Sequence, residues 1–228
     1  MDPLRVAIGI SSSEQPRFGM FFDSLMHVRG VTHENVIYFR GANIAENRNG
    51  IAVKAMEFGF HAVWYVDDDQ VFAPNTLERL ISHDKDIVSG LYVARQIPFV
   101  PHVYHQREDG HITPRLLQNG DRSMISAMVT GAGCLLVKCN VFKKMEKPWW
   151  RLGEADQVNW HDDAGFCKRA RDVGFEVWCD QGCPVGHMLT GVVWPFYKEE
   201  DGEWSTIFIQ SNQLIASWPA ASEKPQGK

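Results

Sequence analysis

Strand-like and helix-like segments alternate along the first part of the chain, and this alternation constrains the fold more than any other feature. Short apolar runs rich in β-branched residues have the length and composition of buried strands. We predict four of them, at 5–10, 35–39, 61–66 and 87–92. Helical spacing of apolar residues follows Pro16, Asn43 and Pro74 in the segments between them. The pattern predicts an α/β fold with a mostly parallel central sheet and helices on both faces.

Length and charge limit the organisation and the partners. The 228 residues suit one α/β domain with a modest appendage, and the net charge of −5 provides no broad basic field for nucleic acid. Residues 96–126 hold prolines, histidines and charges without a helical period, and we interpret them as a long excursion containing a hairpin. We expect a main domain over 1–189 and an extension over 190–228 that packs on the core, with its last residues disordered.

Cysteine usage bears on the compartment. The five cysteines are an odd number, and no signal-peptide pattern precedes the first strand. This usage is typical of reduced thiols. No apolar stretch reaches the roughly 20 residues that cross a bilayer. We therefore predict a cytoplasmic protein without a transmembrane segment.

Three consecutive carboxylates, Asp67, Asp68 and Asp69, directly follow the predicted strand 61–66. Adjacent negative charges destabilise one another unless a cation neutralises them. Carboxylate oxygens suit hard cations such as Mg²⁺ or Mn²⁺. The alternative is a solvated acidic turn that caps the next helix. Because ligands of α/β sheets bind at the carboxyl ends of the strands, we favour a metal site here.

Arg48 and the acidic pair Asp162 and Asp163 are further candidates. The Arg48 guanidinium would pair with the aspartate cluster or with a diphosphate, unless it lies on the surface of its helix. The acidic pair opens a predicted helix, whose dipole stabilises carboxylates. One member of the pair would also serve as a general base.

His187 is a candidate metal ligand, although a lone histidine is more often structural. A zinc site made of Cys179, Cys183 and His187 is a minor alternative, because it needs a fourth ligand and has an unusual spacing.

Taken in chain order, these features resemble the GT-A glycosyltransferases, and family two in particular. The resemblance covers Arg5 to Met188. It rests on a strand with a serine loop, an Arg-Asn helix, an apolar strand leading into D-x-D, the glycine-rich turn 131–133, an acidic pair opening a helix, and a Gly-His pair. It implies a Rossmann-like GT-A fold, with residues 1–189 as the nucleotide-sugar-binding catalytic domain.

The resemblance also implies an activity and a set of site residues. The activity is that of a hexosyltransferase that uses Mn²⁺ or Mg²⁺ and a nucleoside-diphosphate sugar, preferably a UDP-sugar and otherwise a GDP-sugar. Donor contacts would come from Ser11, Ser12, Arg48, Asp67 and Asp68. The metal ligands would be Asp67, Asp69 and His187. The catalytic base of an inverting enzyme would be Asp163, with Asp162 as the second choice.

Two other functions stay open, a nucleotidyltransferase on a related α/β fold and a non-catalytic module that binds sugars or nucleotides. The serine loop lacks the basic residue that nucleotidyltransferases usually have there. A binding module would use tryptophans to stack on sugars, although core packing explains most of them equally well. These tryptophans are Trp149, Trp150, Trp160 and Trp194, of which the first two would alternatively line the acceptor site. The acceptor itself is not indicated by the sequence.

Overall fold

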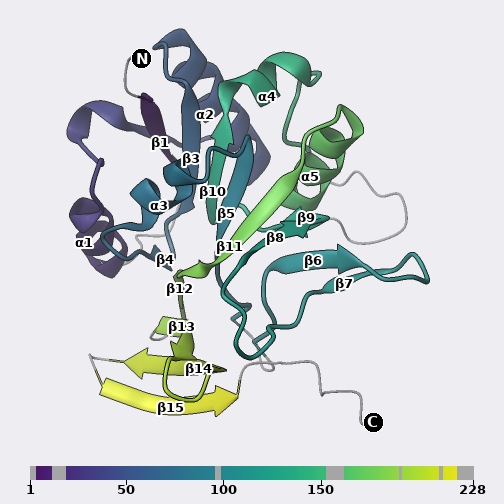
Figure 1. Ribbon diagram of the computed structural model, residues 1–228. Coiled ribbons are helices and arrows are strands. Elements are labelled where there is room, and N and C mark those ends of the chain that lie inside the picture. Colours follow the sequence, from purple (N-terminus) through teal and green to yellow (C-terminus); the bar gives the residue numbers. More distant parts are fainter. Residues whose placement is uncertain are drawn as a thin grey trace.

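A seven-stranded sheet forms the centre of the protein, and two smaller sheets lie toward its lower side in Figure 1. The computed structural model describes residues 4–11, 19–95, 99–152, 162–189, 192–210 and 213–219, with the backbone alone for 208–210 and 213–219. In spatial order, the central strands are β2 (Val36–Phe39), β1 (Val6–Ser11), β3 (Ala62–Asp67), β10 (Cys134–Lys138), β5 (Ile87–Leu91), β11 (Val177–Pro184) and β8 (Met124–Ala127).

The direction of the strands corrects one expectation. Strands β2, β1, β3, β5 and β11 share one direction, but β10 runs antiparallel between β3 and β5, and β8 runs antiparallel beside β11. Three neighbouring pairs are therefore parallel and three are antiparallel. The sheet is mixed, and the expectation of a mostly parallel sheet is wrong.

The path of the chain explains the reversal of β10. After β5 the chain leaves the sheet and forms the hairpin of β6 (Val103–Gln106) and β7 (Ile112–Pro114), which confirms the predicted hairpin. It then passes through β8 and β9 (Val129–Thr130) and turns at residues 131–133. This turn lies at the end where β3 finishes, since Cys134 pairs with Val66. A strand that enters from that end must run against β3.

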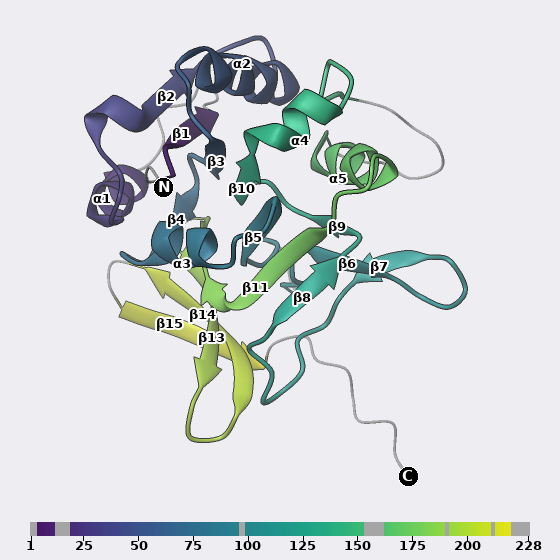
Figure 2. The ribbon, with the colours of Figure 1, turned by 45° about the horizontal axis from the view of Figure 1, so that its top comes forward.

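Helices cover both faces of the central sheet, as predicted (Figure 2). One face carries α2 (Ile44–Glu57), α4 (Cys139–Lys144) and α5 (Asp162–Asp172), and the other carries α1 (Gly19–His27) and α3 (Thr76–Ser82). The 3-10 helix η1 (His33–Asn35) precedes β2. Alternate residues of each strand enter separate cores, so Tyr65 packs on the α2 side and Trp64 on the α3 side.

The smaller sheets extend this framework. One has the order β15 (Gln213–Pro219), β14 (Glu203–Gln210), β13 (Val192–Lys198), β12 (Gly186–Met188) and β4 (Gln70–Val71), and the other has the order β7, β6, β9. Because β12 pairs with both β4 and β13, the predicted extension continues a sheet that begins in the main domain. Residues 220–228, expected to be disordered, lie outside the described residues. None of the described helices is long and apolar enough to cross a membrane.

Local sequence signals bring the candidate residues to one edge of the central sheet. Asn43 caps α2, as predicted, because its side chain accepts the backbone N–H of Glu46 at 2.9 Å. The cap starts the helix one turn before Arg48. Strands β1 and β3 end together, with Ser11 opposite Asp67. The donor-side candidates therefore meet where these strands finish.

Candidate functional site

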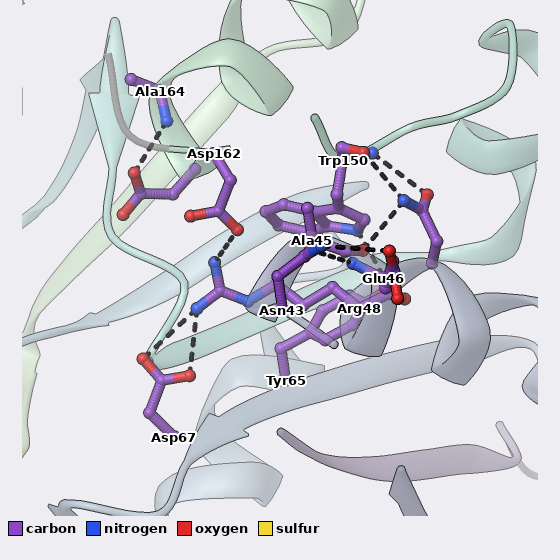
Figure 3. Close-up of polar contacts among 12 residues, drawn as sticks. Asn43, Ala45, Glu46, Arg48, Tyr65, Asp67, Trp150, Asp162 and Ala164 are labelled. Atoms are coloured by element: carbon purple, nitrogen blue, oxygen red, sulfur yellow. Dashed lines mark hydrogen bonds and ion pairs between the residues drawn. The ribbon is translucent and has the colours of Figure 1, made fainter. Parts of the chain in front are cut away.

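Arg48 joins three elements at the carboxyl end of β3 (Figure 3). Its Nη1 donates to Asp162 Oδ2 at 2.5 Å and its Nη2 to Asp67 Oδ1 at 3.0 Å. Burial disfavours the charge of Arg48, but the carboxylates of Asp67, Asp162 and Asp163 raise its pKa above the usual value. Of the predicted partners, the aspartate cluster is therefore the one that Arg48 contacts in this structure.

The ring of a tryptophan lies against the Arg48 guanidinium. The guanidinium carbon lies 5.0 Å from the ring centroid of Trp150, and Trp150 stacks on Phe166 of α5 at 4.0 Å. Asn49 fixes this segment, because its Oδ1 accepts the backbone N–H groups of Trp149 and Trp150. Both tryptophans are buried, with 2% and 1% of their surface exposed. They are core residues, as the alternative of core packing predicts, and Trp160 lies outside the described residues.

The two carboxylates at the start of α5 have different surroundings. Asp162 is buried and engaged by Arg48, whereas Asp163 is partly exposed and accepts the backbone N–H of Ala164 at 2.9 Å. Burial raises the pKa of Asp163, and the charges of Asp162 and Asp67 raise it further, against the effect of Arg48. Asp163 therefore holds a proton more readily than an ordinary aspartate does.

Asp69 and His187 form the other side of the site. His187 Nε2 lies 3.6 Å from Asp69 Oδ2, and Arg95 donates to the same oxygen at 2.9 Å. His187 Nδ1 lies 2.8 Å from the carbonyl oxygen of Val93. A carbonyl only accepts, so Nδ1 is the protonated nitrogen, and in the neutral ring the lone pair of Nε2 faces the carboxylate. A nitrogen ligand of a metal ion is usually oriented in this way.

The residues fit a metal site in part. Within the described residues, no group of three or more His, Cys, Asp or Glu side chains is arranged to hold an ion. Of the three expected ligands, Asp67 faces Arg48, whereas Asp69 and His187 lie close to each other. Two protein ligands suffice for Mg²⁺ or Mn²⁺ when phosphates and water complete the shell. The zinc alternative is wrong, because Cys179 and Cys183 belong to cores on opposite faces of the sheet.

The remaining donor-side candidates line the same edge. Ser11 is buried, and its hydroxyl oxygen has no hydrogen-bond partner among the described residues. Asp68 is also buried, and Ser12 lies outside the described residues. A methyl group built on Gly133 would lie 3.2 Å from Asp67 Oδ2, so the backbone of the glycine-rich turn closely approaches the carboxylate. This proximity agrees with the expected use of small residues there.

Sequence reasoning missed two polar residues of this edge. Arg95 follows the predicted strand 87–92 without any marking pattern, yet its guanidinium contacts Asp69. Gln70 follows the three aspartates without a pattern of its own, yet it is 1% exposed and its side chain lies beside Gly133. A single glutamine or arginine has no spacing signal, so only the fold identifies either one.

Fold and site together define a mixed α/β protein with an acidic cluster at the carboxyl edge of its central sheet. No family model matches the chain, and no curated protein matches it in sequence. Among solved structures, the chain is similar to A197 from STIV, with a TM-score of 0.61 and 13% identity over 93% of this chain and 97% of that one. This similarity extends over nearly the whole of both chains and concerns the fold alone.

Proposed function

We propose that this protein is a metal-dependent glycosyltransferase of the GT-A type, which moves a sugar from a nucleoside diphosphate to an acceptor hydroxyl. The observation that carries the proposal is the convergence of Asp67, Asp69, His187 and Asp163 at one edge of the sheet, although they come from separate parts of the sequence. In α/β proteins this edge is where ligands bind.

On the donor side, Asp69 and His187 would hold Mn²⁺ or Mg²⁺, which would stabilise negative charge on the leaving diphosphate. Ser11, with its unpaired buried hydroxyl, and Asp67 would contact the nucleoside. Arg48 is only 4% exposed and held by two carboxylates, so it positions Asp67 and does not bind the diphosphate directly. A UDP-sugar is the first donor to test and a GDP-sugar the second.

On the acceptor side, Asp163 is the base and Asp162 is structural. The carboxylate of Asp162 forms an ion pair with Arg48, whereas no ion pair joins Asp163 to any described residue. In an inverting transfer, the acceptor oxygen attacks C1 of the sugar and its proton passes to Asp163. The bond between C1 and the phosphate oxygen breaks, and its electron pair leaves with the diphosphate. The raised pKa of Asp163 suits a group that accepts this proton.

The test measures donor hydrolysis and transfer with Mn²⁺, using UDP-glucose, UDP-galactose, UDP-N-acetylglucosamine and GDP-mannose. The variant Asp69→Ala should lose at least a hundredfold in activity while keeping a native circular dichroism spectrum. Asp109→Ala is the control, because Asp109 is an exposed residue between β6 and β7.

Three results would exclude the proposal. Full activity of Asp69→Ala would remove the metal assignment. Release of pyrophosphate from a nucleoside triphosphate, without sugar transfer, would indicate a nucleotidyltransferase. Binding of nucleotide sugars without turnover on any acceptor would indicate a binding module.

A further inference from the structure

Gln70 carries a buried amide oxygen that has no hydrogen-bond partner among the described residues. Its side chain is 1% exposed, and its Oε1 has no partner among the described residues. The unpaired buried atom is therefore the carbonyl oxygen of the amide. Buried polar atoms are nearly always paired, and each exception calls for a physical explanation.

The position of Gln70 indicates what the amide faces. A methyl group built on Gly133 would lie 2.9 Å from Gln70 Nε2 and 3.2 Å from Asp67 Oδ2, so the amide and the carboxylate lie side by side under the glycine-rich turn. In the backbone, Gln70 pairs with His187 across β4 and β12. Gln70 is therefore located between the Asp67 side and the His187 side of the candidate site.

We infer that Gln70 is a specificity-determining residue, which binds a hydroxyl group of the ligand held at Asp67. The inference rests on the proposed function and names a contact that the function alone does not require. A hydroxyl both donates and accepts, so it satisfies either end of an amide. A phosphate oxygen at neutral pH only accepts, and it would leave Gln70 Oε1 unpaired. Asp67, whose side chain is 30% exposed, would accept a neighbouring hydroxyl in the same way.

The sugar and the ribose of a nucleotide sugar both supply such hydroxyls. The shared chemistry is a pair of adjacent hydroxyl groups, one donating to the amide oxygen and the other to the carboxylate. A site built to bond a hydroxyl discriminates strongly against an analogue that lacks it. Gln70 would therefore select for a ligand with an intact hydroxyl at that position.

The test uses Gln70→Met, which removes the amide and keeps an unbranched side chain of similar size. Without ligand, removal of a buried amide whose oxygen is unpaired should raise Tm by about 2–6 °C. With Mn²⁺, affinity for the probe that binds should fall by about tenfold, measured by calorimetry with UDP-glucose and GDP-mannose. Binding of UDP and of dUDP, which lacks the ribose 2′-hydroxyl, locates the hydroxyl. If Gln70→Met loses as much affinity for UDP as for UDP-glucose, the hydroxyl belongs to the ribose. If the affinity falls for UDP-glucose alone, the hydroxyl belongs to the sugar.

Thr76→Val is the matched control. Thr76 in α3 also has a buried oxygen without a partner among the described residues, but it is not one of the candidate site residues. This variant should gain stability without changing nucleotide affinity. If Gln70→Met is less stable than the native protein, or binds the probes equally well, the inference is overturned while the proposed function stands. If the native protein binds no probe, the proposed function fails and the inference fails with it.

Discussion

Replacement of Arg48 by methionine is the most direct perturbation of the site's electrostatics. The change removes the guanidinium that lies over the Trp150 ring and keeps an unbranched apolar side chain. Asp162 is then left as a buried carboxylate without its cation, since the two side chains are 9% and 4% exposed. Loss of one partner from a buried pair costs about 3–5 kcal/mol. Asp67 adds little to this figure because it is 30% exposed and is screened by solvent.

Thermal unfolding checks this magnitude. For a chain of this size, a loss of 3–5 kcal/mol corresponds to a Tm lower by about 6–20 °C at pH 7. Arg29→Met is the control, since Arg29 and Glu78 form an exposed pair worth about 1 kcal/mol or less. An Arg48→Met protein as stable as the Arg29→Met protein would refute the assignment of Arg48 as the buried counter-ion.

The other predictions concern the framework around the site. Trp150→Ala should lower the free energy of unfolding by about 3–5 kcal/mol in urea titration, and unchanged stability would contradict its place in the core. Gly131→Ala should destabilise the protein more than Gly19→Ala in the same assay, because a methyl group on Gly131 would lie 1.9 Å from the hydroxyl oxygen of a neighbouring tyrosine and one on Gly19 meets nothing within 4 Å. Burial tends to raise the pKa of Asp180, but hydrogen bonds from Arg79 and a histidine outweigh it and hold that pKa below the usual range. The stability this provides is present above the unfolded pKa of about 3.9 and is lost as the pH falls through the lower folded value, so the Tm gap between native protein and Asp180→Asn should shrink below about pH 4.

The sequence was a good guide to elements and a poor guide to strand direction. The apolar run that becomes β10 has the same pattern whether it runs with or against β3. Its direction is decided by where the chain re-enters the sheet after the excursion through β6 to β9. That path depends on contacts between distant segments, and no local signal records it. The positions where β1 and β3 end, by contrast, follow from local patterns, and these ends set Ser11 opposite Asp67.

The same distinction applies to the site residues. Charged residues at element ends were identifiable, because three consecutive carboxylates after a strand and an acidic pair before a helix are visible in the local sequence, although the helix dipole alone also favours such a pair. The partner of Asp69 was not identifiable, because Arg95 reaches it through a contact between separate parts of the chain. Tryptophans were the least predictable, since a large aromatic side chain suits a core and a sugar site equally well.

Arg48 connects the two sides of the candidate site, because it contacts an aspartate on each. One guanidinium contacts Asp67 on β3 and Asp162 on α5, and Asp162 is followed immediately by Asp163. In the proposed glycosyltransferase, a single planar group, which lies over the Trp150 ring, would set the position of the donor-side carboxylate relative to the acceptor-side base. Displacement of reacting groups by about 1 Å can lower a rate a hundredfold. A buried ion pair that contributes specificity of geometry in this way would be retained even where an apolar pair packed equally well.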